Sequence, residues 1–231
     1  MKSLLLEIAV DTVEAAVVAE RGGADRVELC GDLAVGGVTP GAELLRAVRE
    51  RIQLPVFVMI RPRAEDFVYS AGAFEEMKAS IAIAKELGAD GLVLGILKAD
   101  NSVDIQRTSE LVSLAKPLPV TFHRAVDETG DLAQALDDVV QTGATRILTS
   151  GGATTALEGA HNIASLVAAA AERITIIPGA GINVDNILSV AVTTRAREFH
   201  SGLSSALPYP RTDYAALECG VRELVDKLRS A

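Results

Sequence analysis

The sequence contains no tryptophan, only 3% aromatic residues and only two cysteines among 231 residues. Cys30 and Cys219 are too few and too far apart for a disulfide framework, so reduced thiols are expected. No uncharged apolar run is long enough to cross a membrane, and Glu7 and Asp11 interrupt the first apolar stretch, where a signal peptide would need apolar or small residues. We therefore expect a cytoplasmic protein without membrane association.

Basic residues are also scarce, because 22 Lys and Arg oppose 31 Asp and Glu and leave a net charge of −9. A nucleic-acid surface needs clustered Lys and Arg, so no nucleic-acid partner is expected. The sequence has no P-loop, dinucleotide fingerprint or zinc motif, which predicts the absence of a nucleotide cofactor. Small molecules or metal ions are the expected partners.

The hydrophobic residues, 49% of the chain, form short runs of strand length that alternate with segments of helical period. This alternation is typical of βα units around a parallel sheet. The eight expected strands cover residues 4–10, 26–30, 56–61, 91–97, 120–124, 146–150, 174–179 and 197–201. Helices are expected between them, for example over 12–23, 72–88 and 131–143.

A partial repeat supports this count. The segments G-A-D-R-V-E-L at Gly23, G-A-D-G-L-V-L at Gly88 and G-A-T-R-I-L-T at Gly143 each end a helix and begin an even-numbered strand. A doubly wound open sheet also shows βα alternation, but eight units in so short a chain favour closure. We predict an α/β fold, a single (β/α)₈ TIM barrel, as one domain over residues 1–231.

Five ionisable residues lie in or at the end of the apolar strands: Glu7, Glu28, Arg61, His123 and His200. Alternate side chains of a barrel strand point inward, and active sites of barrels lie where the strands end. A lone charge there costs several kcal/mol, roughly, unless it is paired. One interpretation is that these groups only pair with one another and satisfy each other's charges and hydrogen bonds. Their convergence favours a site for acid and base chemistry.

His123 begins the segment F-H-R-A-V-D, which adds Arg124 and Asp127 at the end of the same strand. An unshifted imidazole titrates near neutrality, so His123 could act as general acid, general base or metal ligand, or it could be a satisfied core histidine. The predicted catalytic set is Glu7, Glu28, Arg61, His123, Arg124, Asp127 and His200.

Glycine-rich turns follow the last strands, as L-T-S-G-G over 148–152, P-G-A-G-I-N over 178–183 and H-S-G over 200–202. Backbone N–H groups in such turns can approach an anion, although glycine can also serve the backbone alone. Arg61 presents a planar fork that suits a carboxylate or phosphate. The predicted anion-binding set is Arg61, Ser150, Gly151, Gly179, Gly181 and Ser201.

Two sulfurs share the inward parity of these groups. Cys30 follows Glu28, and Met59 precedes Arg61, each by two residues. Soft sulfur ligands together with imidazole suit Cu(I), whereas the alternative is that both are core residues.

At these residues the chain resembles the CutC family, which is named for copper homeostasis. The matching segments are LLEIAVD, GADRVELC, GGVTPG, MIRPR, DFVYS, TFHRAVD, LTSGG, GAGI and EFHS, in this order. The resemblance implies a barrel, a cytoplasmic location, a homo-oligomer (dimer or higher) and copper binding. It also implies a polar pocket made of Glu7, Glu28, Arg61, Asp66, Tyr69, His123, Arg124, Asp127, Ser150 and His200.

The chain departs from the family at two sulfur positions, where Ala9 and Val68 replace cysteines that family members often carry. Cys30 alone remains. One hypothesis is therefore a copper-binding protein with Cys30 as principal ligand, assisted by Met59 or a histidine. The other is an enzyme that holds a small phosphorylated or carboxylated substrate with Arg61 and the glycine-rich turns, while His123 and Glu7 or Glu28 exchange protons. A third hypothesis is that the barrel serves only as an interaction scaffold.

Overall fold

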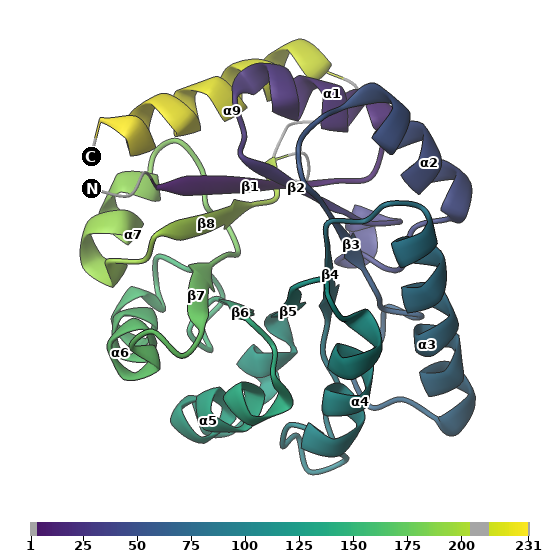
Figure 1. Ribbon diagram of the computed structural model, residues 1–231. Coiled ribbons are helices and arrows are strands. Elements are labelled where there is room, and N and C mark those ends of the chain that lie inside the picture. The colour runs from purple at the N-terminus through teal and green to yellow at the C-terminus, as the bar shows by residue number, and fades with distance from the viewer. Residues whose placement is uncertain (1–3, 204–212, 231) are drawn as a thin grey trace.

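The structure, a computed structural model, describes residues 4–203 and 213–230. Its strands form a ring that is surrounded by helices (Figure 1). The strands are β1 Leu5–Val10, β2 Arg26–Leu29, β3 Val56–Met59, β4 Gly91–Leu94, β5 Val120–Phe122, β6 Arg146–Thr149, β7 Thr175–Pro178 and β8 Glu198–Ser201. The α-helices are α1 Val13–Gly22, α2 Ala42–Arg51, α3 Ala71–Glu86, α4 Ile105–Ala115, α5 Leu132–Thr142, α6 Ala160–Ala170, α7 Ile187–Thr194 and α9 Tyr214–Arg229, with 3₁₀ turns η1 Leu33–Val35 and η2 Arg124–Glu128.

All described ladders are parallel, in the order β7-β6-β5-β4-β3-β2-β1-β8. β1 pairs with both β2 and β8, so the first and last strands meet and the ring is nearly closed. β7 and β8 complete it by lying in contact. The predicted (β/α)₈ barrel is confirmed, and each strand lies within the range that the sequence predicted for it.

Local sequence fixes where the helices begin and end. Thr12 caps α1 by accepting a hydrogen bond from the amide of Ala15, and Gly23 ends this helix with a left-handed φ of 90°. Asp131 and Gly143 do the same for α5, where Asp131 accepts from two amides and Gly143 has φ 83°. These caps satisfy N–H and C=O groups that a helix leaves without partners, and they set the turns that return the chain to the sheet.

Apolar packing divides into two clusters. The larger lies between the strands and the helices and includes Leu6, Ile8 and Phe122, each no more than 1% exposed. The smaller lies inside the barrel and consists of Cys30, Phe57, Met59 and Val93, with Leu33 against it. Buried charged side chains lie beside this cluster, among them Glu7, Arg26 and Glu28.

The outer layer is completed by α9, which packs against α1 beside β1 (Figure 1). Among the described residues, no helix is both long and apolar enough to cross a membrane.

Candidate active site

A cavity of about 620 Å³ lies at the carboxyl ends of the strands. Residues of seven strands or of the loops that follow them contribute to its wall, and β4 with its loop does not. The wall consists of Ala9, Glu28, Leu33, Val35, Gly36, Met59, Arg61, Phe67, His123, Arg124, Glu128, Leu148, Thr154, Thr155, Ala180, Gly181, Ile182, His200 and Gly202. Several residues that the sequence singled out lie in this wall: Glu28, Met59, Arg61, His123, Arg124, Gly181 and His200.

Glu7 and His200 form a hydrogen-bonded pair at the base of this cavity. They are register neighbours on β1 and β8, and Nδ1 of His200 lies 2.7 Å from Oε1 of Glu7. The other carboxylate oxygen of Glu7, Oε2, accepts from Nε of Arg26 at 2.5 Å. Because Nδ1 faces the carboxylate, Nε2 of His200 is directed toward Glu28, whose Oε2 lies 3.9 Å away. A carboxylate that orients an imidazole in this way is a recurrent element of acid and base catalysis.

The charges around this pair shift the two pKa values in opposite directions. Burial alone would raise the pKa of Glu7, but Arg26 and His200 outweigh it and lower the pKa to about 2. Burial alone would lower the pKa of His200, but the carboxylates of Glu28 and Glu7 raise it above its usual value. Glu7 is therefore ionised at neutral pH, and it favours the protonated form of His200.

The pKa of Glu28 is shifted in the opposite direction to that of Glu7. Glu28 is 3% exposed, and burial raises its pKa, with the nearby Glu7 carboxylate adding to the shift while His200 opposes it. Oε2 accepts from the thiol of Cys30 at 3.6 Å, whereas Oε1 is buried without a hydrogen-bond partner in the part of the chain that the structure describes. Two neighbouring carboxyl groups with pKa values moved apart are typical of an acid and base pair.

The charged network continues toward the amino ends of the strands. Arg26 donates from Nη2 to Glu198 at 2.6 Å, and Arg146 lies 3.4 Å from the same carboxylate oxygen. Both guanidinium groups also stack on the ring of Phe57, at 4.6 and 4.5 Å from its centroid. The predicted site omitted Arg26, Arg146 and Glu198. A signal was available, since Arg26 has the parity of Glu28, and Glu198 that of His200.

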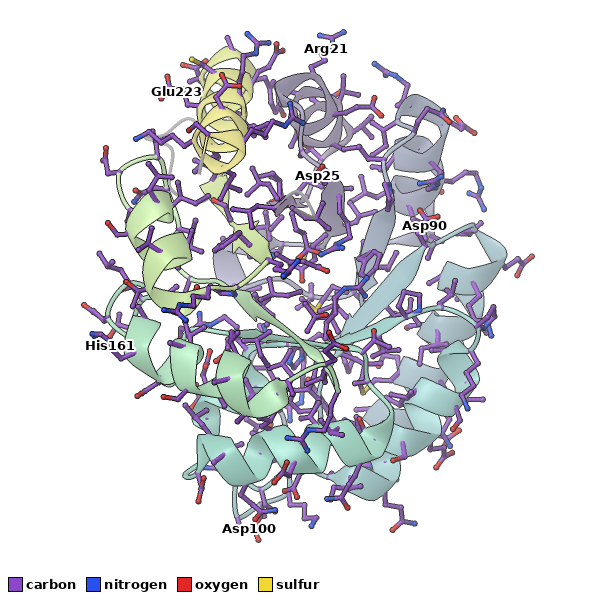
Figure 2. All side chains as sticks on the ribbon, turned by 60° about the vertical axis from the view of Figure 1, so that its left-hand side comes forward. Arg21, Asp25, Asp90, Asp100, His161 and Glu223 are labelled. Atoms are coloured by element: carbon purple, nitrogen blue, oxygen red, sulfur yellow. The ribbon has the colours of Figure 1, made fainter. Side chains whose placement is uncertain are left out.

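His123 has a different character from His200. It is 3% exposed, and burial together with the neighbouring Arg61 lowers its pKa to about 3. Nδ1 accepts from the amide of Ala125 at 3.3 Å, so the ring proton resides on Nε2, which is buried and has no partner among the described residues. A Cβ on Gly95 would come within 2.7 Å of Nδ1, so glycine is required there. His123 is thus a neutral hydrogen-bond donor. The chain's third histidine, His161, projects outward from α6 (Figure 2).

Arg61 is buried by the loops that surround it. Nη1 donates to the carbonyl oxygen of Gly37 at 3.0 Å, and Nη2 donates to that of Ala64 at 2.6 Å. The guanidinium group also lies over the ring of Phe67, 4.8 Å from its centroid. Nε is buried and has no partner within the described residues. The planar fork that the sequence suggested for an anion is therefore used largely by backbone carbonyl groups, and the guanidinium group also interacts with the buried hydroxyl of Tyr69.

Asp127 occupies the glycine-rich turn that follows β6. Its carboxylate accepts from the amides of Ser150 and Gly152 at 3.0 and 3.1 Å and from the hydroxyl of Thr149 at 2.5 Å. The amide of Gly151 donates to the same threonine hydroxyl at 2.8 Å. A side chain of the protein thus takes the place that the sequence suggested for an external anion at Ser150 and Gly151.

Arg124 is the accessible cation of the cavity wall. Nε donates to Asp127 at 3.0 Å and Nη2 donates to the Ser150 hydroxyl at 3.3 Å, while 45% of the side chain remains exposed. The hydroxyl of Ser150 in turn donates to the carbonyl group of Ala153. Asp127 and Ser150 therefore lie outside the cavity wall and hold Arg124 in position on it.

The remaining anion-binding candidates differ in their surroundings. Gly181, with φ +68°, lies in the cavity wall. Gly179 leaves room for Leu148 and His200, since a Cβ there would lie 2.4 and 3.4 Å from atoms of these side chains. Ser201 is buried, and its hydroxyl donates to the carbonyl group of Ile182 at 2.7 Å.

The two sulfur residues belong to one interior cluster, but only Met59 reaches the cavity wall. Cys30 is fully buried, and a Cβ on Gly37 would lie 2.8 Å from its sulfur. Burial and the adjacent Glu28 raise the pKa of the thiol well above its usual value. The types of donor atom fit Cu(I), but the thiol must lose its proton before it can bind a metal.

Two positions suggested by the family pocket lie apart from the cavity wall. Asp66 is an exposed loop residue that pairs with Arg63. Tyr69 is buried, with the Arg63 guanidinium group over its ring.

Comparison with known proteins now places this barrel. The family model described as the CutC family matches residues 4–205. The chain belongs to the CutC family. A CutC family protein of Xanthomonas campestris pv. campestris (strain B100) is 43% identical, over 98% of this chain and 99% of the relative. A human relative named copper homeostasis protein cutC homolog is 48% identical, over 87% of this chain and 74% of the relative.

Solved structures agree with this assignment. The crystal structure of CutC from Streptococcus agalactiae has a TM-score of 0.81 and 33% identity, and the match covers 86% of this chain and 98% of that one. N-(5'-phosphoribosyl)anthranilate isomerase from Pyrococcus furiosus has a TM-score of 0.66 at 16% identity, covering 99% of this chain and 100% of that one. At that identity the likeness concerns the barrel fold alone.

Proposed function

We propose that this CutC chain is an enzyme that transfers protons on a small anionic molecule bound at the carboxyl ends of the strands. The proposal rests on one observation: Glu7, Glu28 and His200 have ligand atoms within 4.8 Å of one another at the base of a cavity of about 620 Å³. A purely structural network would satisfy all of its members, yet Glu28 Oε1 is buried and has no partner in the described chain.

The roles follow from the contacts. Glu28, whose pKa is raised by burial and by the Glu7 carboxylate, is the proposed group that accepts and donates the proton. His200 presents Nε2 beside it, while Glu7 holds Nδ1. Arg26 fixes Glu7 from the opposite side and keeps it ionised. Glu28 and His200 are the proposed catalytic pair, and Glu7 and Arg26 are positioning residues.

Arg124 is the proposed anchor for the negative charge of the substrate. It lies in the cavity wall, it is oriented by Asp127 and Ser150, and nearly half of its side chain is exposed. A phosphate or carboxylate group accepts well from such a guanidinium fork. Gly181 lies in the same wall and adds a place where backbone can approach the anion closely.

A thermal-shift screen of phosphorylated and carboxylated metabolites tests this function. Ligands that stabilise the protein should lose their effect in Arg124→Ala and keep it in Arg222→Ala, which removes a surface arginine with 57% of its side chain exposed. At a ligand concentration of about 100 Kd the expected stabilisation is about 2.7 kcal/mol. Compounds that bind are then assayed for turnover with Glu28→Gln and His200→Gln. Equal turnover by the wild type and both variants would refute the proposed chemistry.

Copper binding is the second candidate, and the proximity of two sulfurs favours it. Cys30 and Met59 lie in one interior cluster, and Cys30 contacts Glu28, which lies beside His200. Sulfur and imidazole suit Cu(I). The names of relatives, such as the human copper homeostasis protein cutC homolog, point the same way. We propose Cys30 as the principal ligand, with Met59 or His200 assisting.

Competition for Cu(I) with a coloured chelator, under reducing conditions, tests the copper proposal. Cys30→Ser should weaken binding strongly, and Met59→Leu should weaken it less. Cys219→Ser is the matched control, because this second cysteine is exposed and lies on α9. Wild-type affinity in Cys30→Ser would remove the proposed site.

We further propose that the chain acts in the cytoplasm as a homo-oligomer. An exposed apolar strip on α7 supports self-association, since Leu188 is 36% and Val192 is 74% exposed, one helical turn apart. Light scattering after size-exclusion chromatography should give a dimer or larger species that Val192→Asp weakens. A monomer at all concentrations would contradict this, and cell fractionation tests the location.

A further inference from the structure

The cavity wall has one apolar side, which two neighbouring strands and their loops build. Leu33 and Val35 come from η1, which follows β2, and Met59 and Phe67 come from the end of β3 and the loop behind it. Val35 is 44% exposed, and Leu33 and Phe67 are half-buried. These side chains therefore offer apolar surface to a ligand in the cavity.

The loops on the other side of the cavity are polar. Those that follow β5 and β6 contribute to the wall His123, Arg124, Glu128, Thr154 and Thr155. His123 lies at the border, with 4.8 Å between its ring centroid and that of Phe67. β2 and β6 are four steps apart in the ring of eight strands, so their loops lie across the barrel mouth from one another (Figure 1). The order of the strands thus gives the cavity an apolar half and a polar half.

Hydrogen bonds hold the apolar half in place. Asp32 caps η1 by accepting from the amide of Ala34 at 2.9 Å. Nη1 of Arg61 donates to the carbonyl oxygen of Gly37, shortly after η1, at 3.0 Å, and Nη2 donates to that of Ala64, in the loop after β3, at 2.6 Å. Arg61 thus ties the two loops together. A wall formed in advance costs a ligand less conformational entropy on binding.

The size of the cavity sets a lower limit on a ligand that fills it. A water molecule takes up about 30 Å³, so a phosphate or carboxylate group alone, equal to a few waters, fills a small part of about 620 Å³. Arg124, the proposed anchor, belongs to the polar half. A ligand that extends from Arg124 across the cavity meets the side chains of η1, which cannot form hydrogen bonds. A polar group there would lose its hydrogen bonds to water without replacement, whereas an apolar group gains by burial.

We propose that the substrate is an amphipathic acid, with a phosphate or carboxylate group bound at Arg124 and an alkyl or aryl group packed against η1 and Phe67. This inference rests on the proposed function, because it names the class of molecule on which the catalytic pair acts. The apolar group contributes affinity and selectivity and takes no part in the proton transfer.

A series of n-alkyl phosphates from methyl to hexyl, compared with inorganic phosphate by isothermal titration calorimetry, tests the inference. Each buried CH₂ contributes about 0.8 kcal/mol, so Kd should fall about fourfold per carbon until the chain passes the end of the apolar half. Arg124→Ala should weaken all members by the same factor and leave the ratio between neighbouring members unchanged.

A substitution and a spectroscopic measurement locate the alkyl chain. Val35→Asn should reduce the gain in affinity for the longer members. Leu114→Asn is the matched control, since Leu114 is 43% exposed on α4, outside the cavity wall. Both side chains are exposed, so both variants should fold. In the wild type, NOEs are expected between the alkyl protons of hexyl phosphate and the methyl groups of Val35.

The outcomes separate this inference from the proposed function. Equal Kd values for inorganic and hexyl phosphate, with binding that Arg124→Ala weakens, would overturn the inference and leave the proposed function intact. A steep dependence on chain length that Val35→Asn leaves unchanged, without NOEs to Val35, would place the alkyl chain elsewhere and overturn it too. A changed oligomeric state in Val35→Asn with unchanged Kd values would assign this side to a second copy of the chain and so contradict it. Binding that follows chain length and depends on Val35, without turnover that depends on Glu28, would support the inference and refute the proposed chemistry. No binding of any member would overturn both.

Discussion

Replacing Arg26 by methionine should destabilise the barrel more than replacing any surface arginine. Arg26 is 7% exposed and bonds to Glu7 and Glu198 on the two strands that close the ring. Methionine keeps much of the apolar length that packs on Phe57, but it leaves the two carboxylates without their main partner. Removing one member of a buried ion pair costs about 3–5 kcal/mol.

The pKa of Glu7 shows that Arg26 stabilises the ionised carboxylate in the folded chain. This pKa falls from 4.5 to about 2, and Arg26 is the largest cause that lowers it. The sign follows from linkage: Glu7 stabilises the fold fully above pH 4.5, and the contribution is lost as the pH falls toward about 2.

Urea unfolding followed by circular dichroism measures the effect. Arg173→Met is the matched control, because its ion pair with Asp137 is exposed, with side chains 45% and 56% accessible, and such pairs contribute about 0–1 kcal/mol. Adding Glu7→Gln to Arg26→Met should recover part of the loss, since it removes an unpaired buried charge. A loss below about 1 kcal/mol in Arg26→Met, equal to the control, would refute the reasoning.

Three further predictions concern the cavity wall and its supports. His123 has a pKa of about 3 in the folded chain against an ordinary 6.5, so the unfolded chain binds the extra proton between these values. The neutral ring therefore contributes fully to stability above pH 6.5, and this contribution falls by about 1.4 kcal/mol per pH unit below that pH. In urea unfolding, His123→Gln should remove this dependence of the unfolding free energy on pH. An unchanged dependence would count against a buried neutral ring. Gly95→Ala should cost about 1–3 kcal/mol by pushing on His123, whereas Gly41→Ala, with open space around it, should not; equal Tm values for the two variants would contradict the close contact. Asp127→Ala should destabilise the turn after β6 and weaken ligand binding through Arg124; unchanged thermal shifts with ligand would show that Arg124 needs no support.

The strands and the closure of the barrel were predictable from the sequence because each strand is a short apolar run with a marked end. The repeated G-A-D and G-A-T turns before β2, β4 and β6 fixed the count. The ends of β1 and β8 were predicted correctly, whereas the other six strands were predicted to end one to three residues too late, for example at Leu97 instead of Leu94 in β4. In β4 the apolar residues Ile96 and Leu97 continue past the end of the strand, so composition alone does not mark that end.

The membership of the cavity wall was predictable in part, because side chains of one parity converge inside a barrel. This places Glu28, Arg61, His123 and His200 together. Arg26 and Glu198 have the same inward parity. They were missed because they lie at the beginnings of their strands, whereas barrel sites are expected at the strand ends.

The roles of individual groups were not predictable, because they depend on contacts that loops create. Asp127 fills the turn after β6 only because η2 brings it there. The tautomer of His123 depends on one backbone amide, that of Ala125. A sequence pattern shows neither the direction of a hydrogen bond nor the burial that sets a pKa.

The measurement that tests the central claim most directly is an NMR titration of His200 and His123, using ¹⁵N signals assigned by replacing each histidine in turn. The account predicts that His200 titrates above its ordinary value of 6.5 and moves downward in Glu7→Gln, while His123 stays neutral with its proton on Nε2 well below that pH. Titration of His200 at or below 6.5, unchanged by Glu7→Gln, would contradict the proposed acid and base pair.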